Sequence, residues 1–140
     1  MKGARVEIDR LSVRRGGREV LLRVSLTVEP GELLVVLGPS GSGKTTLLSC
    51  INGLIDADAG DVRVDGVSIR DQEPHQLRRR IGYAFQAVGL FPHLTVAENI
   101  AVVPRLLRWD AQRVEARISE LLKRVGLDAA LRERLPHQLS

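Results

Sequence analysis

The chain has 140 residues, 44% of them apolar and 27% charged, which is typical of one small globular domain. Its net charge of +4 comes from 21 basic and 17 acidic residues spread along the chain, and only 3% of residues are aromatic. This pattern argues against nucleic acid as a partner, because neither a basic patch nor a set of stacking aromatics is apparent. A single cysteine excludes an internal disulfide framework.

The N-terminal ten residues are charged throughout and do not resemble a signal peptide. The longest purely apolar run, Leu33 to Leu37, is far too short to cross a bilayer. We therefore expect a cytosolic protein, or the cytosolic part of a larger one.

The first predicted elements form an antiparallel region. Apolar and polar residues alternate over residues 6–8 and, after a break, over 11–13, as in a half-buried strand. Residues 14–19 form a basic, glycine-containing turn, and 20–28 form a second strand that Pro30-Gly31 ends.

The next segment differs because it is apolar on both faces. Residues 33–37 suit a central strand of a parallel sheet that is covered on both sides. A helix is predicted over residues 44–51, with Gly53 as its stop. Residues 62–64 and 67–69 flank Asp65-Gly66, a strong two-residue hairpin signal.

The last third of the chain is predicted to be mainly helical. Residues 81–85 form a short strand, and Thr95 with Glu98 makes a capping box for a helix to about Val103. Asp110 caps a further helix that Gly126 ends, with an apolar stripe of Val114, Ile118, Leu121, Leu122 and Val125. Alternating strands and helices indicate an α/β protein with an antiparallel portion.

One motif carries chemistry with high specificity. The pattern G-x-x-x-x-G-K-[ST] is complete in Gly38, Pro39, Ser40, Gly41, Ser42, Gly43, Lys44 and Thr45. Glycines let the backbone wrap around phosphate oxygens, and the following helix adds its positive N-terminal end. Lys44 supplies a charge for the β- and γ-phosphates, and Thr45 offers a hydroxyl to Mg²⁺. The alternative to a phosphate-binding loop is an ordinary glycine-rich turn before a helix. The apolar strand that is predicted before the loop favours nucleotide binding.

These residues resemble the N-terminal portion of an ABC transporter ATP-binding subunit. The phosphate loop is joined by Asn52-Gly53-Leu54, by Phe85-Gln86, and by the stretch from Leu90 to Ile100. The resemblance covers essentially the whole chain. It implies a P-loop NTPase core of the ABC ATPase type over about residues 1–86, with an antiparallel β portion. The start of a helical subdomain would occupy about residues 87–140.

A narrower resemblance is to the importers of osmoprotectants such as glycine betaine, carnitine and choline. It rests on four segments: Asp71 to Pro74, Leu77 to Tyr83, Val103 to Trp109 and Arg134 to Ser140. The resemblance implies an ATP-binding and ATP-hydrolysing subunit on the inner face of the cell membrane. Its substrate would be recognised by other subunits, including a substrate-binding protein.

Carried over residue by residue, the resemblance implies ATP and Mg²⁺ as ligands. Residues Gly38 to Thr46 would form the phosphate loop, with Thr46 as its last member. Gln86 would approach Mg²⁺ and the attacking water, although alone it could be an ordinary polar residue at a strand end. Residues Ala87 to Pro104 would receive a helix of the integral membrane permease, and a second ATP-binding subunit would close head to tail.

Two departures from the family pattern stand out. Arg15 lies where the family usually places an aromatic that stacks on adenine; it could stack through its guanidinium, or belong to a solvated basic turn. Leu139-Ser140 are the first two residues of the signature Leu-Ser-Gly-Gly-Gln, so the family core stops before the signature motif. The metal-ordering aspartate, the catalytic glutamate and the switch histidine have no counterpart within these 140 residues.

Three functions remain open from the sequence. The first is an importer ATPase, and the second is a soluble ABC ATPase that acts on nucleic acid or ribosomes. The third is a nucleotide-binding module without catalysis. The transporter-like stretch from Leu90 to Thr95 argues against the second function. His75, His93 and His137 are expected at the surface, and Cys50 is expected to be buried in a helix.

Overall fold

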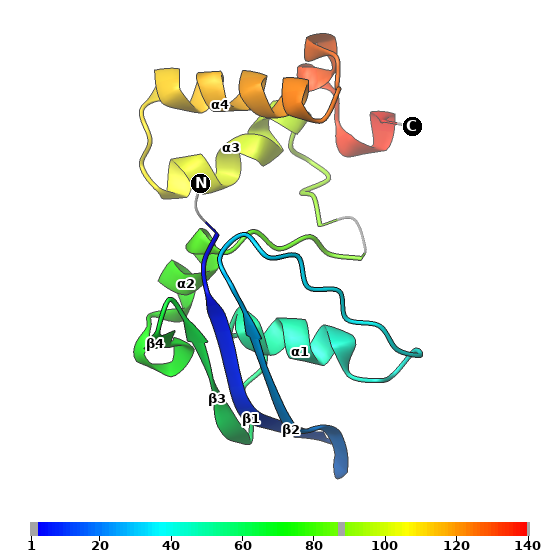
Figure 1. The fold of residues 1–140 in the computed structure, drawn as a ribbon. Helices are drawn as coiled ribbons and strands as arrows, with labels where there is room; N and C mark the ends of the chain where they lie inside the picture. Colours follow the sequence, from blue (N-terminus) through cyan, green and yellow to red (C-terminus); the bar gives the residue numbers. More distant parts are fainter. Residues whose placement is uncertain (1–2, 87–88, 140) are drawn as a thin grey trace. The chain divides into compact units, whose positions relative to one another are not determined.

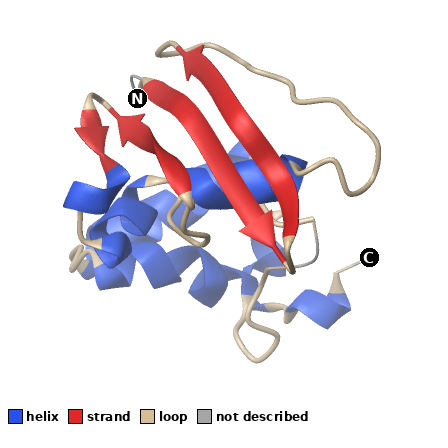
Figure 2. Ribbon diagram, turned by 90° about the horizontal axis from the view of Figure 1, so that it is seen from below, coloured by secondary structure: helices blue, strands red, loops and turns tan. Residues whose placement is uncertain are grey.

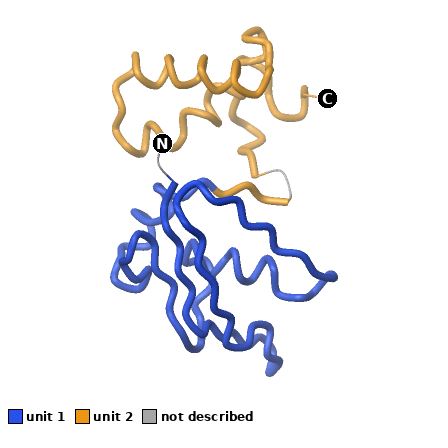
Figure 3. The backbone as a smooth tube through the Cα atoms, in the orientation of Figure 1, with its two compact units in different colours: residues 1–82 blue, residues 83–140 orange. Residues whose placement is uncertain are grey.

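The computed structural model describes residues 3–86 and 89–139 (Figure 1). The chain divides into two compact units, Met1–Gly82 and Tyr83–Ser140 (Figure 3). Each unit has a hydrophobic cluster of its own. The sequence placed the change from one region to the next at about residue 86.

The first unit is built on a four-stranded antiparallel sheet in the order β2-β1-β3-β4 (Figure 2). Its strands are β1 (Val6–Arg15), β2 (Arg18–Val28), β3 (Ala59–Val64) and β4 (Val67–Ser68). Helix α1 (Lys44–Ile51) lies across one face of this sheet (Figure 2). The buried cluster between them consists of Ile8, Leu11, Val13, Leu21, Leu47, Cys50 and Val62.

The break in the alternation of the first strand has a structural cause. The register of β1 shifts between Ile8 and Leu11, and Arg10 there has a φ of 45°. A bulge of this kind adds a residue and lets Ile8 and Leu11, three positions apart, both face the core. Across from it, a Cβ on Gly60 would lie 2.5 Å from the carbonyl oxygen of Arg10, so only glycine fits there. The predicted strand is confirmed, and the irregularity in its pattern marks the bulge.

The predicted hairpin at Asp65-Gly66 is also confirmed. Both turn residues have positive φ, 52° and 79°, as the favoured two-residue hairpin turn requires. The strand after the turn is shorter than predicted, because the 3₁₀ helix η1 (Ile69–Asp71) begins at Ile69. Helix α2 (Pro74–Arg80) follows, an element that the sequence patterns did not predict.

The prediction of a central parallel strand over residues 33–37 is wrong for this structure. The segment is irregular in Figure 1, and its five side chains are 38% to 87% exposed. Residues 81–85, also predicted as a strand, are irregular too. A strand exists only where a neighbour completes its hydrogen bonds. Within the described ranges, neither segment belongs to the sheet of the first unit.

The second unit packs α3 (Val96–Leu106) against α4 (Ala111–Arg124). Its core consists of Val96, Ala97, Ala101, Val114, Ile118 and Leu122. The 3₁₀ helices η2 (Ala129–Glu133) and η3 (Pro136–Gln138) complete it. Helix α3 continues past Val103, its predicted end, although Pro104 lies inside it. The carbonyl groups of Val103 and Pro104 still accept hydrogen bonds, from the amides of Leu107 and Trp109.

The predicted helix starts of this unit are confirmed. The Oγ1 atom of Thr95 accepts from the amide of Glu98, and the Glu98 carboxylate accepts from the amide of Thr95. The carboxylate of Asp110 accepts from the amide of Arg113, and α4 ends just before Gly126. One member of the predicted apolar stripe departs from it: Val125 is 67% exposed, because it is already the C-cap residue of α4.

Candidate nucleotide-binding site

The candidate site is the loop that joins the exposed segment 33–37 to α1. Gly41 and Gly43 have φ values of 81° and 91°, which only glycine adopts without strain. The amide of Ser42 donates to the carbonyl of Pro39 at 3.3 Å and closes a turn within the loop. The chain thus reverses tightly before the first turn of α1, whose amide groups have no partner within the helix.

Close packing against β2 fixes the end of this loop. A Cβ atom on Gly43 would lie 2.9 Å from the carbonyl oxygen of Val20 and 2.9 Å from the Cδ2 atom of Leu21. A Cβ on Gly38 would lie 2.7 Å from the Oγ atom of Ser42. Glycine is therefore needed at position 41 for its dihedral angles, and at position 43 both for its dihedral angles and for the close approach to the backbone of β2.

The ammonium group of Lys44 is directed back into the loop. Its Nζ atom donates to the carbonyl oxygens of Gly38 and Pro39, each at 2.7 Å, and to the Oγ atom of Ser42 at 3.2 Å. A positive charge therefore lies within the loop, at the N-terminus of α1. This arrangement fits an anion, because glycine backbone, helix N-terminus and ammonium group all favour negative charge at one place.

Two threonines follow the lysine in the first turn of α1. Thr45 is exposed and Thr46 is half-buried. An exposed hydroxyl next to a phosphate-binding loop suits Mg²⁺, which takes oxygen ligands. The described residues contain no group of three or more histidine, cysteine, aspartate or glutamate side chains that could hold a metal ion by themselves. The available oxygen donors therefore fit a metal ion that is coordinated mainly by phosphate oxygens better than one coordinated only by protein side chains.

The other two predicted site residues lie apart from the loop along the chain. Arg15 ends β1 at the hairpin turn, is exposed, and donates to the carbonyl of Arg14 at 3.3 Å. Gln86 is exposed and belongs to the second unit. Residues 38–46 form one continuous loop and helix start, and their roles in nucleotide binding, like those of Arg15 and Gln86, stay predictions.

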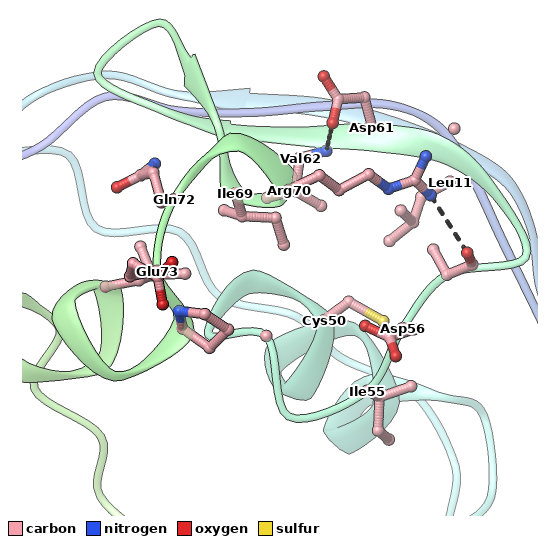
Figure 4. Close-up of a pocket in the computed structure, with 15 residues that line it drawn as sticks. Leu11, Cys50, Ile55, Asp56, Asp61, Val62, Ile69, Arg70, Gln72 and Glu73 are labelled. Carbon is pink, nitrogen blue, oxygen red and sulfur yellow. Dashed lines mark hydrogen bonds between the residues drawn. The ribbon is translucent and has the colours of Figure 1, made fainter.

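A separate cavity of about 390 Å³ lies in the first unit, between β3, η1 and α2 on one side and the end of α1 on the other (Figure 4). Arg70 lines it and donates to the carbonyl of Ala57 at 3.2 Å. Cys50 also lines it and is 1% exposed, which confirms that it is a buried helix residue. Burial raises the pKa of its thiol, although the charge of Arg15 opposes that change. Burial thus disfavours the thiolate form, as is typical of a structural cysteine.

In the second unit, the segment after Gln86 carries two exposed apolar side chains. Leu90 is 47% exposed and Phe91 is 49% exposed. Leu90 also borders an apolar groove of about 370 Å³ that Val96, Ile100, Leu121, Leu122, Val125, Leu127 and Leu139 line. Ala87, where the predicted permease contact begins, lies outside the described residues.

Asn99 belongs to the stretch that carries the family resemblance, but the sequence predicted no role for it; it makes the densest set of side-chain hydrogen bonds in the described part of the second unit. Its Oδ1 atom accepts from the amide of Phe91 at 2.8 Å. Its Nδ2 atom lies within hydrogen-bond distance of the carbonyl oxygens of Phe91, Leu94 and Thr95, at 3.1, 2.9 and 3.0 Å. An asparagine in the first turns of a helix, where its propensity is poor, was the available signal.

The three histidines are exposed, as predicted. Within the residues that the structure describes, no helix has both the length and the apolar character needed to cross a membrane.

Comparison with known proteins gives a consistent answer. The choline transport ATP-binding protein OpuBA of Bacillus subtilis (strain 168) is 46% identical over 126 residues, which are 90% of this chain and 33% of that protein. The glycine betaine uptake system ATP-binding protein YehX of Escherichia coli (strain K12) is 45% identical over 135 residues, 96% of this chain and 44% of that protein. The chain thus spans between a third and a half of the length of these relatives.

A similar structure supports the same assignment. The ATP-binding cassette MJ0796, solved as a dimer in a post-hydrolysis state with ADP and Pi, matches with a TM-score of 0.82 and 31% identity. The match covers 96% of this chain and 63% of the other. A family model described as ABC transporter matches residues 21–140. The chain has the ATP-binding cassette fold over the N-terminal part of that cassette, and it belongs to the ABC transporter family.

Proposed function

We propose that this chain is the phosphate-binding part of a subunit that binds and hydrolyses ATP to power an importer of osmoprotectants. The observation that carries the proposal is the loop at residues 38–43, with the Lys44 ammonium group directed into it. The substrate class rests on similarity to proteins named for choline and glycine betaine transport.

In this proposal the loop binds the phosphates of ATP. Lys44 turns from the loop carbonyls toward the β- and γ-phosphates, while the amides of the loop and of the first turn of α1 donate to phosphate oxygens. Thr45 holds Mg²⁺ through its hydroxyl. The metal, when bound, neutralises charge that develops on the phosphates. Gln86 contributes to the same metal and to the attacking water in the assembled protein.

The partners follow from the same assignment. A second ATP-binding subunit completes each site, in keeping with the dimeric state of the MJ0796 cassette. An integral membrane permease contacts the segment Ala87 to Pro104, at the inner face of the membrane. The exposed apolar side chains of Leu90 and Phe91 support this part of the proposal, because apolar contact area is what such an interface requires.

The test is uptake by proteoliposomes that contain the permease, the substrate-binding protein and an ATP-binding subunit carrying these 140 residues. We expect ATP-dependent uptake of labelled glycine betaine, choline or carnitine. Lys44→Ala should abolish this uptake and Lys123→Ala, at the exposed end of α4, should not. Uptake of sulfate instead would overturn the substrate class, since a sulfate/thiosulfate import protein of Nitrosomonas europaea is 45% identical.

A further inference from the structure

We infer that Asn99 is the positioning residue that presents Leu90 and Phe91 to the membrane subunit. This inference rests on the proposed function, and it goes beyond it by assigning a role to a side chain that acts on the backbone of the segment carrying Phe91. Its basis is the set of hydrogen bonds between the Asn99 carboxamide and the backbone of residues 91–95.

The Asn99 carboxamide makes hydrogen bonds with both backbone polar groups of Phe91. Phe91 donates its amide to Oδ1 and accepts from Nδ2 with its carbonyl oxygen. The same carbonyl accepts from the amide of Leu94 at 3.2 Å, which closes a turn. The backbone of Phe91 is thereby held through both its N–H and its C=O group, and the residue is left 49% exposed.

Asn99 is itself fixed in place. Its own amide donates to the carbonyl of Thr95 at 2.9 Å, as part of the first turn of α3. The helix start is secured independently by the capping box of Thr95 and Glu98. Because the start of α3 is fixed, the Asn99 side chain is held rigidly. It can therefore order residues 91–95, which directly precede the helix, in the absence of a bound partner.

Neither of the two side chains closest in shape to asparagine can make this set of hydrogen bonds. Aspartate keeps an acceptor for the Phe91 amide. Its second carboxylate oxygen, however, would face the carbonyl oxygens to which the Asn99 amide group donates in the wild type, and would repel them. Leucine has nearly the same shape and makes none of the bonds. Both substitutions should free residues 91–95 while leaving the capping box intact. The partner would then have to order this segment on binding, which weakens association.

The experiment has a local and a functional arm. Hydrogen exchange on the 140-residue chain should show the Phe91 amide protected in the wild type and in Thr95→Ala, and exchanging at least about tenfold faster in Asn99→Leu and Asn99→Asp. Co-purification of the ATP-binding subunit with its permease should fall by at least about tenfold in both Asn99 variants. Thr95→Ala is the matched control, because it weakens the start of α3 without removing a bond to Phe91.

Two outcomes separate the inference from the proposed function. If Phe91→Ala and Leu90→Ala leave permease association unchanged, the interface in the proposed function is wrong. If those variants weaken association and Asn99→Leu does not, the interface stands and the role of Asn99 is overturned. An equal loss in Asn99→Leu and Thr95→Ala would also overturn it, since a general weakening of α3 would then explain both.

Discussion

In the proposed site, Lys44 is the residue on which we expect nucleotide binding to depend most directly. It is the one lysine in the loop region, and its ammonium group lies within the turn that the glycines form. A charged hydrogen bond from this ammonium group to a phosphate oxygen should contribute about 1.5 to 3 kcal/mol to nucleotide binding. The half-buried side chain belongs to no hydrophobic cluster, so its removal should spare the fold.

We therefore expect Lys44→Ala to lower the affinity of the 140-residue chain for ATP·Mg at least about tenfold, with an unchanged circular dichroism spectrum. Calorimetric titration measures the affinity, and Lys123→Ala serves as the control for loss of one positive charge. Wild-type affinity in the Lys44 variant would remove the loop from the proposed site.

At the scale of elements, the α3 start provides a pH-dependent contribution to stability. The hydrogen bonds from the amide and hydroxyl of Thr95 hold the pKa of the Glu98 carboxyl below its ordinary value. The unfolded chain therefore takes up this proton at a higher pH than the folded one. The stabilisation is complete above the ordinary pKa of a glutamate and is lost as the pH falls through the lowered pKa.

Thermal unfolding of the chain between about pH 6 and pH 3 should reveal this dependence. In Glu98→Gln the midpoint should fall less steeply over the same range, because the amide side chain cannot take up a proton. Glu133→Gln, in η2 of the same unit, is the control. Identical slopes for the wild type and Glu98→Gln would show that the capping box does not contribute.

The elements that the sequence predicted correctly are determined by residues within or next to the element itself. Asp65-Gly66 dictates its own turn, Thr95 and Glu98 cap their own helix, and α4 has an apolar stripe at helical spacing. Residues 33–37 were predicted from burial on both faces, which depends on neighbours elsewhere in the chain. Helix α2 was missed because seven residues hold little periodic signal.

The same distinction applies to the candidate site. The tight turn of residues 38–44 was predictable because its glycines lie close together along the chain and each acts on its own segment of backbone. The hydrogen bonds of Asn99 were not predictable, because they form where the chain folds back and brings the backbone of Phe91 next to α3. The hydrogen-bond partners of a carboxamide depend on how the chain folds, so a pattern of residue types does not predict them.

At the scale of the whole molecule, the chain corresponds to only part of a cassette. The MJ0796 match leaves 37% of that chain, the remainder after the covered 63%, without a counterpart here. The apolar segment 33–37 is correspondingly exposed. The family resemblance implies that the aspartate, glutamate and histidine that order metal and water belong to the part of a cassette that these 140 residues do not cover.

We expect the 140-residue chain to release phosphate from ATP no faster than background. An otherwise identical chain, extended with the remainder of a cassette, should show steady turnover that Lys44→Ala abolishes. Phosphate release by the two purified proteins is the measurement. Turnover by the 140-residue chain that also depends on Lys44 would show that these residues suffice for catalysis.

The contacts of Lys44 have a consequence for what the loop can accept. Before any ligand arrives, the ammonium group already has two carbonyl oxygens and a hydroxyl as partners. Binding is therefore an exchange, and an incoming group must attract the ammonium more strongly than those neutral dipoles do. A phosphate oxygen carries formal charge and should attract the ammonium group more strongly than a carbonyl oxygen does. A hydroxyl of an uncharged nucleoside is a neutral dipole, like the carbonyl oxygen that it would replace, and should gain little. We therefore expect the loop to discriminate between ligands by charge, before any contact with base or sugar can contribute.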